Sequence, residues 1–329
     1  MQASRRQFVL GSLGAAAAAT LGAPRAFAAA GYPERPITFI CPWPAGGTAD
    51  VTMRALCSAA AKELGQPVVV DNKAGASGMI GLKTMSGARP DGYTIGQIPI
   101  SVTRFAQLGA VQLDPLKDVT YIARVSGQTF GIAVRVDAPW KTLKDLVADA
   151  KARPDMITYG TAGLGGATHV GMEEFAQVAG AKFRAIPYKG GSEALQGLMG
   201  EQVDLLADSS SWAPMVKAGK LRLLATWGAQ RTHEFKDVTT LRESGYDVVV
   251  DAPNGIGGPK GMPADVVARL RAAFKVAAAS PEFARACGAI DAPLLYLDAP
   301  EYEKYVAATY AKDAQLIERL KLKELLGSK

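Results

Sequence analysis

The sequence is poor in the residues on which catalytic and metal sites most often depend. Histidine occurs only at positions 169 and 233 among 329 residues. A histidine-based catalytic triad or a zinc site with two histidines would have to join distant parts of the chain. The sequence therefore indicates neither arrangement, and we expect no metal site.

Cysteine is also scarce and occurs at positions 41, 57 and 287. An odd number of cysteines without CxxC spacing argues against a disulfide framework or a zinc site. Each cysteine lies in an apolar segment, which favours three buried thiols. A Cys41–Cys57 disulfide remains an open alternative, because an exported protein would meet oxidising conditions.

Long runs of one residue type are missing beyond the N-terminal segment. No later stretch approaches 18 consecutive apolar residues, so no membrane-spanning helix is predicted. No later run of five or more basic residues occurs, although the formal net charge is +6. A basic surface for nucleic acid is not supported, and we expect no nucleic-acid partner.

The first 28 residues have the composition of an export signal. Arg5, Arg6 and Arg25 flank an apolar stretch over residues 9–21, and an AFA sequence follows at 26–28. A charged start, a short apolar core and small residues at a cleavage site are typical of such signals. We therefore expect a periplasmic protein that is cleaved near Ala28.

Two further properties follow from this N-terminal segment. The SRRQFV sequence at 4–9 resembles a twin-arginine signal, and an ordinary Sec signal with two arginines is the alternative. Without residues 1–28 the formal charge falls from +6 to 34 − 31 = +3. The basic excess is thus largely a property of the signal.

The remaining composition is that of a globular protein with about two domains. Apolar residues make up 48% of the chain and charged residues 21%, and roughly 150 residues per domain gives two. Short β-branched runs alternate with Gly-rich turns and helical patterns, which indicates an α/β fold. Because the pattern occurs in two parts of the chain, we expect two lobes of parallel construction.

The C-terminal third has a different pattern. Residues 255–263 form a Gly/Pro-rich passage, and helices are predicted at 264–279, 300–312 and 314–326. Such a helical tail must bury its apolar faces, and we expect it to pack on the first lobe. Chain crossings near 124–128 and 248–255 then predict lobe one at 29–126 and 251–329, and lobe two at 127–250.

Four loops share one feature, since each follows a predicted strand, is rich in small residues and opens a predicted helix. They are PAGGTAD at 44–50, NKAGASG at 72–78, GTAGLGGATH at 160–169 and PYKGG at 187–191. Free backbone N–H groups and the positive end of the helix dipole favour anions at such turns. Because ligands of open α/β sheets bind at the carboxyl ends of strands, these loops would hold a carboxylate.

The sequence motifs of nucleotide-binding sites and of nucleophilic serines are incomplete in this chain. The G-x-G-x-x-G pattern that starts at Gly163 meets Thr168 where the third glycine belongs, and no P-loop sequence occurs. The sequence around Ser77 departs from G-x-S-x-G at its last position, Met79. We therefore expect no cofactor and no catalytic residue.

Individual residues near these loops have two possible roles. Asp50 either complements the helix dipole or contacts the ligand, and His169 with Glu173 forms a helix contact or a metal site. Trp43 either packs in the interior or flanks an organic ligand, as does Trp212. Tyr188 can donate from its phenol to a carboxylate.

The ordered set of motifs resembles the Bug family, the extracytoplasmic solute-binding subunits of tripartite tricarboxylate transporters. Besides the loops at 44–50, 72–78 and 187–191, it comprises YPERP at 32–36, ARPDGYT at 88–94, AGKLR at 218–222 and GPKGMP at 258–263. The resemblance implies a two-lobe periplasmic-binding-protein fold, each lobe a mixed sheet flanked by helices, with the ligand cleft between the lobes. It covers the chain from about Tyr32 to the C-terminus.

The resemblance also implies a set of ligand-binding residues. They are Ala45, Gly46, Gly47, Asp50, Asn72, Gly75, Ala76, Ser77, Gly78, Thr161, Ala162, Gly163, Thr168, His169, Tyr188 and Gly190. Trp43 is added because it lies beside an expected cleft loop, and Asp208 because it ends a lobe-two strand. The PWP sequence at 42–44 and the Ser-rich stretch at 208–212 depart from the common family pattern. Both departures fall beside the expected cleft, so the ligand could differ from that of typical relatives.

The function implied is capture of a small organic acid by hinge closure and its delivery to membrane transporter subunits. The ligand could be a di- or tricarboxylate, an amino acid or an aromatic carboxylate, and we expect a monomer. One alternative is a periplasmic hydrolase or isomerase that uses Ser77, His169 and Asp50 near the cleft. Another is a ligand sensor for a signalling system, which the sequence does not separate from a transport role.

Overall fold

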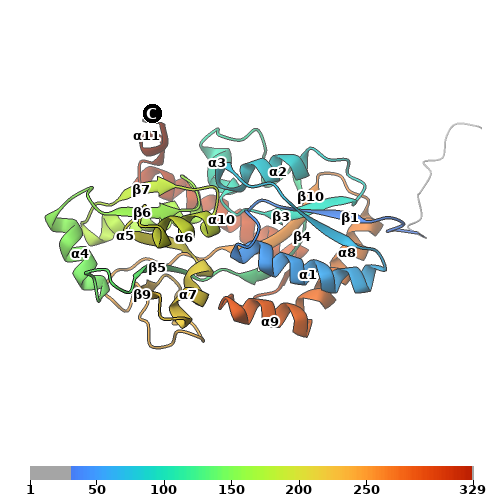
Figure 1. The fold of residues 1–329 in the computed structure, drawn as a ribbon. Coiled ribbons are helices and arrows are strands. Elements are labelled where there is room, and N and C mark those ends of the chain that lie inside the picture. Colours follow the sequence, from blue (N-terminus) through green and yellow to red (C-terminus); the bar gives the residue numbers. More distant parts are fainter. Residues whose placement is uncertain (1–30, 328–329) are drawn as a thin grey trace, which may run out of the picture. The chain divides into compact units, whose positions relative to one another are not determined.

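The strands of the described residues form two mixed sheets (Figure 1). The structure is a computed structural model that describes residues 31–327, so the predicted export signal lies outside the described residues. Both sheets belong to one compact unit that begins at Tyr32. The α/β class and the mixed sheets expected from the sequence are confirmed.

The first sheet has the strand order β11-β4-β10-β3-β1-β2. Strand β1 pairs in parallel with β2 and β3, whereas β10 runs antiparallel to β3 and β4. The bounds are β1 Ile37–Cys41, β2 Val68–Asn72, β3 Thr94–Ile98, β4 Val119–Gly127, β10 Pro253–Pro259 and β11 Leu297–Asp298.

The second sheet has the order β7-β6-β8-β5-β9. Its strand β6 pairs in parallel with β7 and β8, and β5 is antiparallel to β8 and β9. The bounds are β5 Phe130–Arg135, β6 Thr158–Thr161, β7 Arg184–Pro187, β8 Leu205–Ser209 and β9 Leu221–Thr226.

Two connections join the sheets. The chain leaves the first sheet after β4, passes through residues 128–129 and enters β5. It returns from β9 through residues 227–252 into β10. The connections overlap the predicted crossings at residue 128 and at residues 248–252, while the boundaries of the two lobes themselves stay a prediction.

Helices flank both sheets (Figure 1). Helix α1 has the predicted bounds, because Gly47 precedes it and Gly65 ends it in the left-handed conformation at φ 71°. The helices are α1 Thr48–Leu64, α2 Met79–Ser86, α3 Val102–Gln107, α4 Leu143–Ala152, α5 Ala167–Ala179, α6 Gly191–Met199, α7 Ala213–Lys217, α8 Ala264–Ala278, α9 Pro281–Ala289, α10 Ala299–Arg319 and α11 Leu322–Gly327, with 3-10 turns at Ala76–Gly78 and Ser210–Trp212.

The core of the first sheet forms where α1 and α8 pack against each other. Phe39 of β1, Leu56 of α1 and Phe274 of α8 are fully buried in one cluster. Burial of each such side chain contributes roughly 1.5–3 kcal/mol. Trp212 is also fully buried, between β5 and Phe235, so its interior role is the one observed.

Strand β10 was not predicted, because its sequence PNGIGGP is rich in Gly and Pro. The structure places it in the middle of the first sheet. A Cβ at Gly255 would overlap the Tyr302 hydroxyl of α10, and one at Gly257 would lie 2.7 Å from the Thr120 carbonyl oxygen. The glycines therefore allow close packing of neighbouring elements rather than a turn.

The C-terminal helices differ from the prediction of a break near residue 313. Helix α10 runs without interruption through Asp313, whose side chain is buried against α3. The tail packs on α3 and β4, as expected for the first lobe. It also reaches the second sheet's helices, because Ile317 and Leu322 share an apolar cluster with Val170 of α5.

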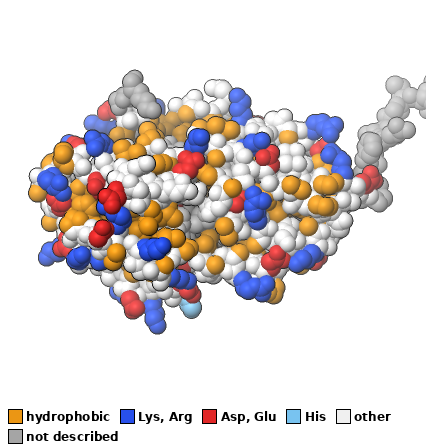
Figure 2. All heavy atoms as spheres, viewed as in Figure 1, with side chains coloured by type: hydrophobic (Ala, Val, Ile, Leu, Met, Phe, Trp, Pro, Cys, Tyr) orange, Lys and Arg blue, Asp and Glu red, His pale blue; other side chains and the backbone are white. Residues whose placement is uncertain are grey.

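The surface and the cysteines agree with the expectations from composition. On the face shown in Figure 2, Lys and Arg side chains are interspersed with Asp and Glu.

Within residues 31–327 no helix combines the length and the apolar character that a membrane span needs. Cys41, Cys57 and Cys287 are free and buried, so the bridge left open between the first two is not formed.

Candidate functional site

A cavity of about 50 Å³ lies where the carboxyl ends of β1, β3, β6 and β8 meet. Five residues of the predicted set line it, namely Trp43, Gly47, Ala162, Thr168 and Asp208. The other lining residues are Pro44, Thr48, Ala49, Gln97, Pro99, Ile100, Ser101, Gln128, Phe130, Gly166, Ala167, Gly191, Ser209 and Ala252.

Three helices begin at this cavity without a side-chain cap. Gly47 precedes α1, Gly166 precedes α5 and Gly190 precedes α6, and none offers a side chain to the first N–H groups. Two helices away from the cavity do have side-chain caps, Thr142 for α4 and Ser280 for α9, whereas α8 does not. The cavity therefore meets three helix N-termini whose orphan N–H groups can bind an anion.

The loop before α1 is fixed by Asp50. Its carboxylate accepts hydrogen bonds from the Gly46 N–H at 2.9 Å, from Arg54 at 3.0 Å and from the Asn72 amide at 2.8 Å. Burial favours the neutral acid, but these hydrogen bonds hold the pKa of Asp50 below its usual value. Asp50 thus holds the loop, and neither it nor Asn72 lines the cavity.

Asn72 completes this arrangement. Its side-chain amide also donates to the Trp43 carbonyl oxygen at 2.9 Å. The loops 44–50 and 72–78 are thereby tied to each other, and the position of Trp43 on the cavity wall depends on the tie. Ala45 and Gly46 belong to the same loop but do not line the cavity.

The turn formed by Gly75, Ala76, Ser77 and Gly78 reaches the loop that follows β6. The Ser77 hydroxyl donates to the Leu164 carbonyl oxygen at 2.8 Å. A Cβ at Gly163 would lie 2.5 Å from the Ser77 hydroxyl oxygen, so the absence of a side chain there permits the approach. Ser77 is therefore engaged in a contact between loops of the two sheets.

The loop after β6 is organised by its own side chains. The hydroxyls of Thr161 and Thr168 are 2.7 Å apart, and the Ala162 N–H donates to Thr168 at 3.3 Å. The Gly165 N–H donates to Nδ1 of His169 at 3.2 Å. Thr161 and His169 thus shape the turn from which Ala162 and Thr168 face the cavity.

His169 itself is an interior residue. It is buried, its ring stacks on Tyr159, and its Nε2 lies 4.0 Å from the Glu173 carboxylate. Burial, assisted by the charge of Arg104, lowers the pKa of His169 to about 4. The imidazole is therefore neutral at pH 7, and the described residues contain no cluster of metal-ligating side chains.

Tyr188 and Gly190 lie beside the cavity rather than in its wall. The Tyr188 hydroxyl donates to Gln202 at 3.4 Å, and its ring packs over Gly160 and Gly197. Gly190 faces the ring of Pro44, into which a Cβ would project. Gly190 thus permits the loops of the two sheets to touch.

Asp208 is the only acidic or basic residue among the described residues that line the cavity. It is buried, and burial raises its pKa to about 7 although Ser211 and the Ser209 N–H hydrogen-bond to it. The carboxylate sits beside Gly191, where a Cβ would overlap it. The lining contains no Lys, Arg or His, so an anion here would rely on backbone dipoles.

Loops of the two sheets touch around the cavity. The hydroxyls of Thr48 and Ser209 are 2.9 Å apart, in addition to the Ser77 and Gly190 contacts. The cavity volume of about 50 Å³ is far below the roughly 300–1,000 Å³ of typical ligand pockets. Separation of these loops would make room for a larger molecule.

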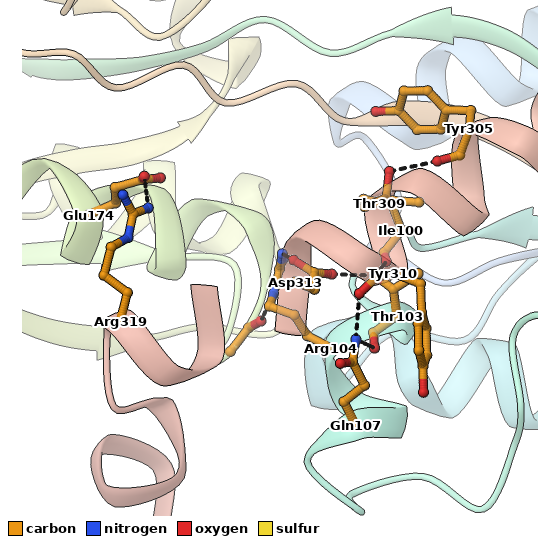
Figure 3. A network of polar contacts seen from close by, with 11 residues as sticks. Ile100, Thr103, Arg104, Gln107, Glu174, Tyr305, Thr309, Tyr310, Asp313 and Arg319 are labelled. Atoms are coloured by element: carbon orange, nitrogen blue, oxygen red, sulfur yellow. Dashed lines mark hydrogen bonds and ion pairs between the residues drawn. The ribbon is translucent and has the colours of Figure 1, made fainter. Parts of the chain in front are cut away.

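A network of polar contacts joins α10 to α3 and α5 (Figure 3). Arg104 of α3 pairs with Asp313 of α10 at 2.7 Å and donates to the Gly165 carbonyl oxygen at 3.3 Å. Thr103 donates to the other oxygen of Asp313, and Arg319 at the end of α10 pairs with Glu174 of α5. The C-terminal helix thus contacts helices of both sheets.

Comparison with known proteins decides the family. The family model of the tripartite tricarboxylate transporter family receptor, TctC, matches residues 52–322. The chain belongs to this family. A UPF0065 protein of Cupriavidus necator is 40% identical over 321 residues, which cover 97% of this chain and 98% of the relative.

Solved structures of similar proteins share the fold of this TctC family receptor. The periplasmic binding protein BugD gives a TM-score of 0.85 at 30% identity, over 88% of this chain and 99% of BugD. A protein of R. palustris solved with adipate gives 0.83 at 26% identity, over 88% and 98% of the two chains. The resemblance to the Bug family is confirmed.

Several lining residues of this family member were missed from the sequence. Gln97, Pro99 and Ser101 follow the same rule that located the other loops, because they lie at the carboxyl end of β3. Gln128 and Ala252 come from the connections between the sheets. No local motif marks those connections, so only the tertiary structure assigns them.

Proposed function

We propose that the protein is a periplasmic solute-binding protein for a small organic carboxylate. The observation that carries this proposal is the meeting of three uncapped helix N-termini, those of α1, α5 and α6, at one cavity. Each N-terminus carries about half a positive charge and several unpaired N–H groups. A carboxylate can accept from these groups without a cationic side chain.

A carboxylate fits better than a phosphorylated cofactor. The cavity of about 50 Å³ lacks Lys and Arg, which usually accompany phosphate sites. The similar R. palustris structure was solved with adipate, a dicarboxylate. These points support an organic acid as the ligand class.

Opening and closing of the two lobes is the mechanism that we propose. Within residues 31–327 the backbone passes between the sheets at residues 128–129 and 227–252, and the C-terminal helix α10 contacts helices of both. Bending of these connections would separate Thr48 from Ser209 and Pro44 from Gly190. A ligand that contacts both loops stabilises the closed form by its differential affinity for it.

The ligand would then pass to the membrane subunits of a tripartite tricarboxylate transporter. We infer that residues 1–28 direct export, with the twin-arginine route favoured by Arg5 and Arg6. Replacing both residues by lysine should stop export by the twin-arginine route. N-terminal sequencing of periplasmic protein should find a start near Ala29.

Catalysis is not favoured by the geometry. Ser77 donates to a backbone carbonyl and His169 accepts from a backbone N–H, and neither residue lines the cavity. The nucleophile and base of a hydrolase would have to contact each other and the substrate. We therefore infer binding without turnover.

A thermal-shift panel tests the proposal on protein freed of co-purified ligand by unfolding and refolding. Mono-, di- and tricarboxylates should raise Tm in at least one class at millimolar concentration, because ligands that bind the native state stabilise it. Matched amides and amines without a carboxylate are the controls. A rise with the amides equal to that with the acids, or no rise with any acid, would refute carboxylate binding.

A further inference from the structure

Gln97, a residue of the cavity lining, carries a side-chain acceptor without a hydrogen-bond partner. It lies on β3, lines the cavity and is only 2% exposed. Its Oε1 atom is buried and has no hydrogen-bond partner. Among the described residues that line the cavity, no other side chain has a buried polar atom in this state.

The orientation of this carboxamide follows from its neighbours. The Gly127 carbonyl oxygen can only accept, so the Asn254 group 3.2 Å from it must be the NH₂, which also donates to Ser126 at 2.9 Å. Oδ1 of Asn254 is then left as an acceptor for Nε2 of Gln97 at 2.9 Å. Because Nε2 is committed to Asn254, Oε1 of Gln97 is the free end.

An acceptor without a partner in a buried position is unfavourable, and a donor that reaches it is favoured. The carboxylate of Asp208, which also lines the cavity, already receives hydrogen bonds from Ser211 and the Ser209 N–H. Among the described lining residues, Gln97 is therefore the one whose buried side-chain acceptor lacks a donor. It calls for an O–H or N–H group on the ligand.

We propose that Gln97 selects carboxylates that carry a hydroxyl or ammonium group over unsubstituted acids of the same length. This inference rests on the proposed function, because the helix N-termini anchor the carboxylate while Gln97 reads a second group. Gln97 acts as a specificity-determining residue and not in chemistry. A site built around such an acceptor discriminates against the analogue that lacks the donor.

The test compares matched ligands by calorimetry or tryptophan fluorescence with stripped protein. The sets are lactate and propionate, then malate, aspartate and succinate, then 2-hydroxyglutarate, glutamate and glutarate. The substituted acid of at least one set should bind about 5- to 100-fold more tightly than its unsubstituted partner. Comparison of hydroxy with amino acids identifies which donor is used.

Gln97→Met keeps the side-chain length and removes the acceptor. The affinities of the substituted and the unsubstituted acid of a set should then differ by no more than about twofold. Gln97→Glu keeps an acceptor oxygen and should retain a preference for the substituted acid, even where its charge weakens all binding. Gln107→Met is the matched control, because Gln107 joins α3 to α10 at Thr103 and Tyr310 and does not line the cavity. It should leave the ratio unchanged.

The ratio is measured within each variant, so a general loss of stability does not imitate the effect. Binding of both members of every set with equal affinity in the unmodified protein would overturn the role of Gln97 and leave carboxylate binding intact. A preference that persists in Gln97→Met would also overturn it. No binding of any acid would instead refute the proposed function.

Discussion

Arg104 and Asp313 form a buried ion pair that joins α3 to α10, with Nη1 and Oδ1 at 2.7 Å. Both side chains are less than a tenth exposed, and Arg104 also donates to the Gly165 carbonyl oxygen of the loop after β6. The pair lies at the centre of the network in Figure 3. It connects the C-terminal helix to a loop that contributes to the cavity.

Removal of one partner should be strongly destabilising. Arg104→Met leaves the Asp313 carboxylate buried without its cation, and the expected loss is about 3–5 kcal/mol in the free energy of unfolding. Urea unfolding followed by circular dichroism measures it. The exposed pair of Lys62 and Glu282 offers a control, because Lys62→Met should cost at most about 1 kcal/mol. Equal losses in the two variants would contradict a buried role for Arg104.

The contact between Gly190 and Pro44 suggests a variant that should hinder closure of the two lobes without unfolding the chain. Gly190 has an extended backbone at φ 178°, which alanine also adopts, but a Cβ would overlap the Pro44 ring. Gly190→Ala should therefore weaken carboxylate binding at least tenfold, with little change in the Tm of the ligand-free protein. Gly288→Ala is the matched control, since no atom lies within 4 Å of its Cβ position. Unchanged affinity in Gly190→Ala would show that the two loops need not touch.

Local sequence patterns predicted much of the fold. The run from Thr48 to Leu64 has apolar helical periodicity between two glycines, and α1 has those bounds. Strand β10 was not predicted because its glycines make room for Tyr302 and Thr120, which are distant in sequence. The break predicted near Asp313 is absent because a polar residue can stay in a helix when a distant arginine pairs with it.

The site was predicted less completely, for a related reason. The rule of strand ends located the loops that contain Gly47 and Thr168, which line the cavity. Resemblance alone could not tell a residue that faces the ligand from one that holds the loop, as Asp50 and Asn72 do. Gln97 carries no motif, and its orientation depends on Asn254, which follows it by 157 positions.

The burial of His169 predicts a pH dependence of stability. Its folded-state pKa of about 4 lies below the ordinary value of 6.5, so between these values the unfolded chain binds the proton. Stability from this residue is complete above pH 6.5 and falls by about 2 kcal/mol as the pH drops to 5. Asp208 titrates with the opposite sign, because its pKa is raised to about 7.

The two contributions can be separated by a variant. The difference in unfolding free energy between the unmodified protein and His169→Gln should shrink by about 2 kcal/mol from pH 7.5 to 5, because glutamine has no such titration. Urea titrations at both pH values measure it. A pH-independent difference would mean that His169 has the same pKa in the folded and the unfolded chain, contrary to the lowered value.

The three buried cysteines predict thiols that do not react in the folded protein. Burial raises the pKa of Cys41 and Cys287 to about 12, and the pKa of Cys57 is raised as well, so the reactive thiolate is scarce. A thiol reagent should label none of the three in native protein and all three in urea without reductant. Only one labelled thiol in urea would reveal a disulfide.

The glycine that precedes α1 gives a direct test of the anion site. Gly47 has φ −75° and ψ 168°, a conformation that aspartate adopts as an N-cap, and its Cβ position lies 3.4 Å from the Pro44 carbonyl oxygen. Gly47→Asp should place a carboxylate on the N–H groups of α1 and stabilise the ligand-free protein slightly, by a few tenths of a kcal/mol.

The same change should compete with the ligand for those N–H groups and weaken carboxylate binding at least tenfold, because the added charge repels an anion. Gly47→Asn supplies a neutral cap and should weaken binding less. Pro263→Asp, at the N-cap of α8 outside the cavity lining, should leave binding unchanged. Calorimetry with the acid that gives the largest thermal shift decides the matter. Equal affinity in Gly47→Asp and the unmodified protein would mean that the N-terminus of α1 does not hold the carboxylate.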